Sequence, residues 1–208
     1  MKRLGITQRV ENVRHYSERR DCLDQRWATV ALHLGYVPLP LPNIAEDQVP
    51  QLLDNLQLDG VLLSGGNSIA SLEPNSADAA PERDNFESAL IEQTIERNLP
   101  LIGVCRGMQM INFKLGGRLV PISGHVAVRH SIKPIGDLPI PETVNSFHNW
   151  AIPRDGLAPE LSPLALDSAD NVEAFECAEK KLLGIMWHPE RESPISSLDV
   201  QLFKRYLS

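Results

Sequence analysis

The sequence contains little cysteine, and the cysteines it has are isolated from one another. Three occur in 208 residues, at Cys22, Cys105 and Cys177, and no Cys-x-x-Cys pair is present. This spacing excludes the usual zinc and redox motifs, which need paired cysteines. Unpaired thiols are typical of a reducing compartment, so we expect a cytoplasmic protein. No run approaches the roughly 18 apolar residues of a membrane helix. Residues 1–8 also become polar too early for a signal peptide.

The chain also lacks basic clusters. Its formal net charge is −7, and no segment is rich in lysine or arginine. This balance argues against binding to nucleic acid, and we expect no membrane partner. An acidic chain can still bind an anionic small molecule through a few local arginines. At this length we expect one domain over residues 1–208, large enough to fold without a disulfide or a metal.

Strand-like and helical patterns alternate in the first half of the chain. Strands are expected at 4–7, 36–42, 59–66 and 99–104, and helices at 22–34, 48–56, 83–97 and 105–115. A polar loop follows the first strand, and 67–81 is expected to form a surface loop. The alternation predicts an α/β fold: a flavodoxin-like, mostly parallel sheet with helices on both faces.

The second half changes character. Short strands are expected at 118–122, 143–147, 163–168, 172–177 and 182–187, followed by a last helix at 195–207. Proline and glycine turns separate these strands, so we expect them to add antiparallel pairing to the parallel sheet.

The segment around Cys105 has the pattern of a nucleophile elbow. The apolar run 99–102 precedes Gly103-Val104-Cys105-Arg106-Gly107, and a helical pattern follows at once. Such a strand–turn–helix exposes one side chain at a sharp turn, here a thiol at the positive end of a helix. A thiolate is favoured there over a thiol. Cys22 and Cys177 have no such context, and we expect them to be inert packing residues.

Two further segments could complete a nucleophilic site. The apolar run 182–187 leads into His188-Pro189-Glu190, which supplies an imidazole base and an acid to orient it. The third predicted strand ends in Gly65-Gly66, whose backbone N–H groups can approach a ligand closely. One of these, paired with the N–H of Arg106, would form an oxyanion hole.

These motifs carry a family resemblance. Residues 103–109, 62–67 and 186–190 together resemble the class I glutamine amidotransferase fold. They are more similar to its stand-alone peptidase C26 branch, the γ-glutamyl-γ-aminobutyrate hydrolase type. Residues 144–148 resemble an Asn-Ser-x-His element of that branch. The resemblance covers almost the whole chain.

The resemblance implies a cysteine hydrolase that releases glutamate from a γ-glutamyl amide. Cys105 would attack the γ-carbonyl to form a thioester, His188 would transfer the proton, and Glu190 would orient His188. Gln109 would hold the glutamyl group. Asn145, Ser146 and His148 match the substrate-facing element. The resemblance implies neither a metal nor an organic cofactor.

A narrower resemblance concerns the leaving group. Residues 5–11, 16–21 and 187–192 are similar to the bacterial enzymes that hydrolyse γ-glutamyl-CDP-amidate during phosphoramidate decoration of capsular polysaccharide. Trp150 and Arg191 replace the glutamine and the aromatic residue common in γ-aminobutyrate-type enzymes. Arginine matches phosphate oxygens, so Arg9, Arg19, Arg20 and Arg191 could meet a diphosphate; the alternative is that they are solvated surface charges.

Alternatives remain at this point. The chain could be a γ-glutamyl-γ-aminobutyrate-type hydrolase, a glutaminase subunit that supplies ammonia to a synthetase, or an inactive small-molecule binder on the same scaffold. A homodimer is possible. Four histidines lie outside the motifs and are expected to be surface residues: His15, His33, His125 and His130. The spacing of His125 and His130 does not fit a metal pair on one helical face.

Overall fold

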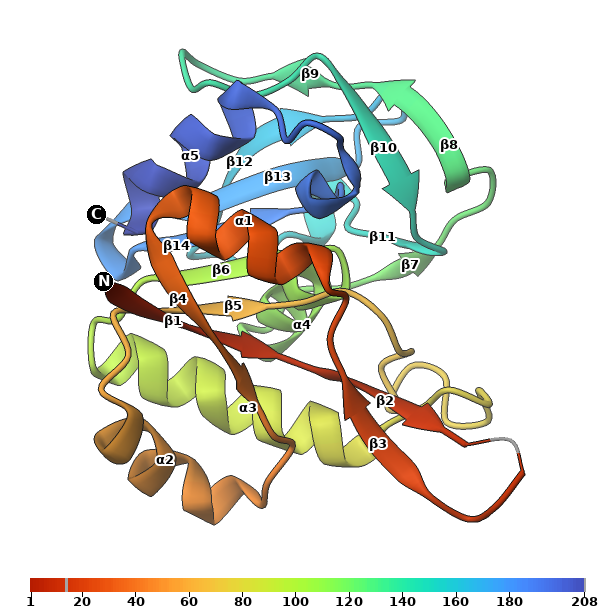
Figure 1. Ribbon diagram of the computed structural model, residues 1–208. Coiled ribbons are helices and arrows are strands. Elements are labelled where there is room, and N and C mark those ends of the chain that lie inside the picture. Colours follow the sequence, from red (N-terminus) through yellow and green to blue (C-terminus); the bar gives the residue numbers. More distant parts are fainter. Residues whose placement is uncertain (14, 208) are drawn as a thin grey trace.

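A computed structural model describes residues 1–13 and 15–207. Its central eight-stranded sheet has the order β4-β1-β5-β6-β14-β13-β12-β9 (Figure 1). The first five strands are parallel: β4 (Tyr36–Leu41), β1 (Lys2–Thr7), β5 (Gly60–Leu63), β6 (Leu101–Val104) and β14 (Leu182–Ile185). The last three pair antiparallel: β13 (Val172–Cys177), β12 (Ser162–Leu166) and β9 (Lys133–Pro134). The predicted α/β architecture is therefore confirmed.

Helices cover both faces of this sheet (Figure 1). One face packs against α1 (Arg26–Leu34) and α5 (Ser197–Leu207), and the other against α2 (Val49–Leu56), α3 (Pro81–Glu96) and α4 (Arg106–Lys114). Alternate residues of each strand serve opposite faces. Leu62 joins the core under α1 and α5, while Val61 and Leu63 join the core under the other three helices. Both faces of β5 are buried, which explains its continuous apolar run.

The N-terminal region differs from the prediction in one place. Instead of a polar loop, β2 (Arg9–Asn12) and β3 (Arg19–Cys22) form an antiparallel hairpin. Cys22 therefore belongs to a strand, and the first helix begins at Arg26 rather than at 22. Helical spacing across 22–34 was overridden by strand pairing, a tertiary contact that local periodicity does not register.

A second hairpin lies beside the antiparallel part of the sheet (Figure 1). It consists of β8 (Val126–Ser131) and β10 (Thr143–Phe147). Only β10 was predicted, because β8 is largely exposed and has no regular apolar alternation. Ala127 has a φ of 56° where the register shifts, so it is the extra residue of a β-bulge. Because of this extra residue, the side chains that precede Ala127 in the strand lie on the opposite face of the hairpin from the one that regular alternation would give them. The small pair β7 (Val120–Pro121) and β11 (Trp150–Ala151) completes the strands.

No helix in the described part of the chain is both long enough and apolar enough to span a membrane.

Two glycines allow α4 to pack tightly against the parallel strands. A Cβ at Gly103 would lie 2.7 Å from the backbone of Gly107, and a Cβ at Gly107 would lie 2.2 Å from the carbonyl oxygen of Leu63. Any side chain at either position would push the start of α4 away from β5 and β6. These contacts explain why glycine stands two residues before and two residues after Cys105.

We expect Gly107→Ala to destabilise the protein by about 3 kcal/mol or more, because the clash is with backbone that cannot rotate away. Gly116→Ala is the matched control. Gly116 has a φ of 90° but nothing within 4 Å of its added Cβ, so it should lose only the left-handed conformational cost of about 1–2 kcal/mol. Urea unfolding of both variants measures the difference. Equal losses would contradict the steric explanation.

Candidate active site

Three neighbouring parallel strands direct their carboxyl ends to one place. In β5, β6 and β14, Leu63 pairs with Gly103, and Val104 pairs with Ile185. The chain continues from these ends to Gly65, Cys105 and His188. Residues far apart in the sequence are therefore brought together by strand pairing, at the edge where open α/β sheets bind ligands.

Cys105 occupies the strained turn predicted from its motif. Its φ of 52° and ψ of −107° are unusual for a residue with a side chain. The Cys105 N–H donates to the carbonyl of Ile185 over 2.8 Å, which fixes the turn against β14. Helix α4 begins at Arg106, whose N–H is the first of the helix and has no acceptor within it. The Cys105 side chain is thus held at a helix N-terminus, where negative charge is stabilised.

His188 and Glu190 form a buried pair beside this cysteine. Nδ1 of His188 lies 2.6 Å from Oε1 of Glu190, and both side chains are 3% exposed. With Nδ1–H donating to the carboxylate, Nε2 is the ring nitrogen left for the thiol. Nε2 has no partner at hydrogen-bond distance among the described residues. The Cys105 contact is therefore loose, as is common in catalytic sites without substrate.

Cys105 nevertheless affects the pKa of the His188 imidazole. Burial lowers the pKa of His188, but the negative charge of Cys105, together with Glu190, outweighs burial and raises this pKa to about 9. A protonated imidazole next to a thiolate is the charge arrangement of an activated cysteine nucleophile.

Glycines fit the turn after β5 to the imidazole. A Cβ at Gly65 would lie 2.7 Å from Cε1 of His188. Gly66 has a φ of 86° and lies against the side chain of Arg9. Of the predicted oxyanion donors, Gly65 thus lies against the His188 ring and Arg106 directly follows Cys105, and the role of all three, Gly66 included, remains a prediction.

A buried ionic network lies under these groups, and the sequence interpretation missed it. Arg83 donates to the carbonyl oxygens of Ser64, Gly65 and Gly66 and pairs with Glu87. The side chain of Arg106 pairs with Glu87 and Asp84. Burial would raise the pKa of Glu87, but the charges of Arg106 and Arg83 hold it below its usual value.

This network fixes both halves of the predicted oxyanion site, the glycine turn and the residue after Cys105. A signal was present in the sequence. Arg83 and Glu87 lie at helical spacing from Phe86 and Leu90, which places all four on the buried face of α3.

Asn145 has a different place from the one predicted. Its amide nitrogen donates to the backbone carbonyl of His188 over 2.8 Å, and its amide oxygen accepts the His188 N–H over 2.9 Å. These two bonds use the amide to clamp the base, and Asn145 does not line the cavity beside Cys105. Ser146 is likewise turned away, with its hydroxyl donating to the carbonyl of His125. The structure thus shows Asn145 positioning His188 and Ser146 bonded to the backbone, and their substrate contacts stay a prediction.

A cavity of about 300 Å³ opens beside the thiol. Gln109, which donates to the Trp150 carbonyl over 3.0 Å, lines it together with His148, Arg9 and Arg191. Arg191 stacks on the Phe147 ring, with its guanidinium 4.0 Å from the ring centre. These four predicted residues are thus brought to the nucleophile.

Arg19 and Arg20 do not reach this cavity. Both lie on the β2–β3 hairpin, where Arg19 pairs with Glu82 and Arg20 pairs with Glu18. Strand pairing thus turns both side chains toward acidic neighbours, and a role for them in binding phosphate stays a prediction. Of the predicted arginines, Arg9 and Arg191 are placed to meet an anion.

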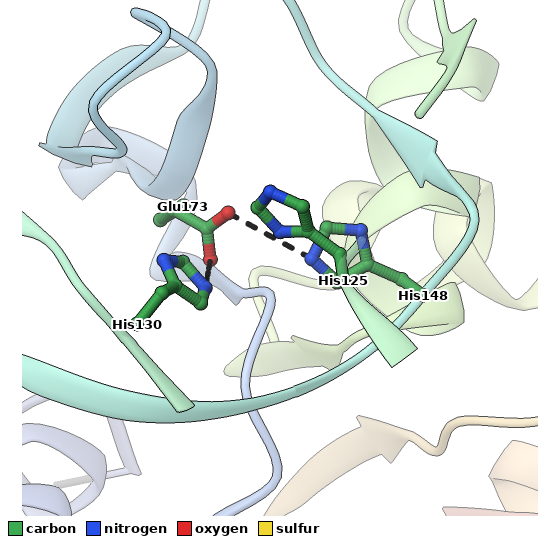
Figure 2. Close-up of side chains that lie close together, drawn as sticks. All are labelled: His125, His130, His148 and Glu173. Atoms are coloured by element: carbon green, nitrogen blue, oxygen red, sulfur yellow. Dashed lines mark ion pairs between the residues drawn. The ribbon is translucent and has the colours of Figure 1, made fainter. Parts of the chain in front are cut away.

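Two histidines predicted to lie at the surface are instead part of a cluster. The side chains of His125 and His130 are only 17% and 19% exposed, and they gather with His148 around Glu173 (Figure 2). The surface prediction for His125 and His130 was wrong because it considered only whether the two residues share a face of a helix. The bulge at Ala127 places residues on both sides of it on one face of the hairpin.

Comparison with known proteins agrees with this geometry. The peptidase C26 family model matches residues 4–190. The chain belongs to the peptidase C26 family. It is therefore a hydrolase, as its motifs predicted.

Curated relatives and solved structures add detail. The chain is 33% identical over 208 residues to the γ-glutamyl-CDP-amidate hydrolase of Campylobacter jejuni, covering 99% of this chain and 97% of that protein. It is 27% identical to the γ-glutamyl-γ-aminobutyrate hydrolase of Escherichia coli K12, covering 89% and 85%. A glutamine amidotransferase from Thermotoga maritima superposes with a TM-score of 0.66 at 16% identity, covering 99% and 84%. This last likeness supports the fold alone.

The charge coupling between Cys105 and His188 can be measured directly. We expect Cys105→Ala to lower the pKa of His188 by about one unit or more, because the thiol's charge no longer stabilises the imidazolium while burial still opposes it. A pH titration of the His188 ring signals by NMR, assigned with His188→Gln, gives the value. Cys22→Ala is the control and should leave the pKa near 9. An unchanged pKa in Cys105→Ala would contradict the coupling.

Proposed function

We propose that this protein cleaves the γ-glutamyl amide bond of γ-glutamyl-CDP-amidate and releases L-glutamate and cytidine diphosphoramidate. The observation that supports the chemistry is the convergence of Cys105, His188 and Glu190 at the ends of adjacent parallel strands. The near full-length relative named for this substrate supports the leaving group. Such an activity would belong to the phosphoramidate decoration of a capsular polysaccharide.

The proposed reaction has two halves. In the first, Sγ of Cys105 attacks the γ-carbonyl carbon, and a carbon–sulfur bond forms while negative charge develops on the carbonyl oxygen. The N–H groups of Arg106 and of Gly65 or Gly66 receive that charge. The carbon–nitrogen bond then breaks, and the His188 imidazolium gives its proton to the leaving nitrogen. The second half is hydrolysis of the thioester: His188 takes a proton from water, and the resulting hydroxide displaces Cys105 and frees glutamate.

Charges around the cavity suit both ends of this substrate. Glu73 and Asp78 line the cavity together with Arg9 and Arg191. A glutamyl group presents an ammonium and a carboxylate, and a diphosphate adds further negative charge. Guanidinium groups form paired hydrogen bonds with carboxylate and phosphate oxygens. Trp150 donates its indole N–H to Glu73 over 2.9 Å, so the 67–81 loop is tied to the wall of the cavity.

The nucleophile is tested by substitution and by substrate choice together. Cys105→Ala should fold normally and lose at least about a thousandfold in kcat, since nucleophile and base act as a unit. Glutamate release is then measured with glutamine, γ-glutamyl-γ-aminobutyrate and γ-glutamyl-CDP-amidate, using the isolated protein. We expect the largest kcat/KM for the nucleotide amidate.

Each of the other results identifies a different activity. Preference for γ-glutamyl-γ-aminobutyrate would replace the proposed substrate. Turnover of glutamine that appears only when a second polypeptide is added would indicate a glutaminase subunit. Full turnover by Cys105→Ala would remove the thioester from the mechanism.

The two cavity arginines are tested against two matched neighbours. Arg9→Ala and Arg191→Ala should each raise KM for γ-glutamyl-CDP-amidate about tenfold or more, since a hydrogen bond to a charged group contributes about 1.5–3 kcal/mol. Arg19→Ala and Arg20→Ala remove the same charge from the β2–β3 hairpin and should leave KM unchanged. Steady-state kinetics on the four variants gives the comparison. Equal effects at all four positions would mean that net charge, rather than contact at the cavity, governs binding.

A further inference from the structure

The cluster behind the cavity wall has the composition of a metal site. One ligand atom from each of His125, His130, His148 and Glu173 lies within 4.8 Å of all the others. Figure 2 shows the three rings gathered around the Glu173 carboxylate. Nε2 of His130 lies 3.7 Å from Oε2, and Nε2 of His148 lies 3.8 Å from Oε1.

Hydrogen bonds on the outer side of the rings set their tautomers. Nδ1 of His148 lies 2.9 Å from the Trp150 carbonyl, and Nδ1 of His130 lies 3.3 Å from the Ser131 carbonyl. A carbonyl only accepts, so each Nδ1 holds the proton and each Nε2 presents a lone pair inward. Histidines that bind metals are oriented by this same outer hydrogen bond.

The inward-facing atoms have no adequate partner in the protein. Nε2 of His130, Nε2 of His148 and Oε2 of Glu173 are buried without a hydrogen bond among the described residues. The Glu173 side chain is 2% exposed, and no arginine or lysine pairs with it in the described chain. A single proton on Glu173 could serve one imidazole and would leave the other unsatisfied. Leaving buried polar atoms unpaired is costly. A cation at the centre would satisfy all of them at once.

We propose that His125, His130, His148 and Glu173 bind one zinc ion, which fastens the β8–β10 hairpin to strand β13. Three imidazoles and one carboxylate are ligands that zinc accepts in tetrahedral geometry. Zinc–nitrogen bonds of about 2.0–2.1 Å place ligand atoms about 3.3 Å apart. The observed separations, which are at most 4.8 Å, therefore need the ligand atoms to approach one another by up to about 1.5 Å. Nitrogen donors also favour zinc over magnesium or calcium, which prefer oxygen.

The surroundings agree with this assignment. Nδ1 of His148 keeps its proton toward the Trp150 carbonyl, so Nε2 is free to bind metal. Asp167, whose Oδ2 lies 4.0 Å from Nε2 of His125, can orient that ring.

The site would matter for the cavity without being part of the proposed reaction. His125 and His130 belong to the β8 side of the hairpin, His148 follows β10, and Glu173 belongs to β13 of the central sheet. His148 also lines the cavity beside Cys105. A zinc ion would thus fix the cavity wall and the hairpin whose Asn145 clamps His188.

The test uses the Cys105→Ala protein, because a thiol next to His188 could itself bind zinc. After removal of metal with a chelator, zinc chloride is titrated calorimetrically. We expect one zinc per chain, a higher thermal midpoint, and slower hydrogen exchange confined to residues 122–149. Cobalt should give the visible bands of a tetrahedral site without a sulfur charge-transfer band.

Paired variants in the same background decide where the metal binds. His125→Ala/His130→Ala should weaken zinc binding by more than about 100-fold, since even supporting groups outside a coordination shell contribute 10–100-fold. His15→Ala/His33→Ala removes two histidines elsewhere and should bind zinc normally. His130→Gln is the milder variant, used if the double variant does not fold as judged by circular dichroism. Equal zinc uptake by all variants, or none by the parent protein, would overturn the proposal.

Discussion

Parallel pairing of β6 with β14 is the constraint on which the site depends. These strands lie on either side of the long antiparallel half of the chain in sequence, yet they are neighbours in the sheet. The pair Val104–Ile185 fixes how far each chain travels before it leaves the sheet, and the bond from the Cys105 N–H to the Ile185 carbonyl continues that register into the turn. A slip of one residue would exchange the buried faces of β14 and move His188 away from the thiol. Since both faces of these strands are buried, the core enforces the register that the chemistry needs.

The strained turn at Cys105 is held in place by the buried ion pairs of Arg83, Glu87 and Arg106. Glu87 binds Arg83, Arg106 and the hydroxyl of Thr7, so one carboxylate joins α3, the nucleophile turn and the end of β1. Arg83 in turn holds the carbonyls of the glycine turn. Breaking a buried ion pair by removing one partner costs about 3–5 kcal/mol, far more than an exposed pair. The network therefore acts less as a source of net stability than as a rigid frame, in which the backbone N–H groups near Cys105 have no freedom to turn away.

Much of this arrangement was predictable because it is local in the sequence. The strand–turn–helix at Cys105 and the His188-Pro189-Glu190 segment each have their chemistry within a few residues, and alternation of strands and helices indicated the sheet. What local pattern could not predict depends on pairing between distant strands. The β2–β3 hairpin turned Arg19 toward Glu82 instead of the cavity. The clamp by Asn145 exists because the hairpin folds over His188, and the histidine cluster exists because one extra residue at Ala127 changes the face of a strand.

The site thus has two parts of different rigidity. The nucleophile, base and glycine turn directly follow fully buried parallel strands, whereas one wall of the cavity belongs to a hairpin with Val126, Val128 and Phe147 exposed at its surface. A two-stranded hairpin is marginally stable by itself. Its position must therefore come from contacts with the rest of the structure: the Asn145 clamp, the bond from Arg129 to Glu192, and the cluster around Glu173. This division places Cys105, His188 and the glycine turn at the ends of the parallel strands, while the hairpin contributes Val126 and Phe147 to the wall of the cavity. Replacement of these hairpin residues should then reshape the wall without disturbing the strained cysteine.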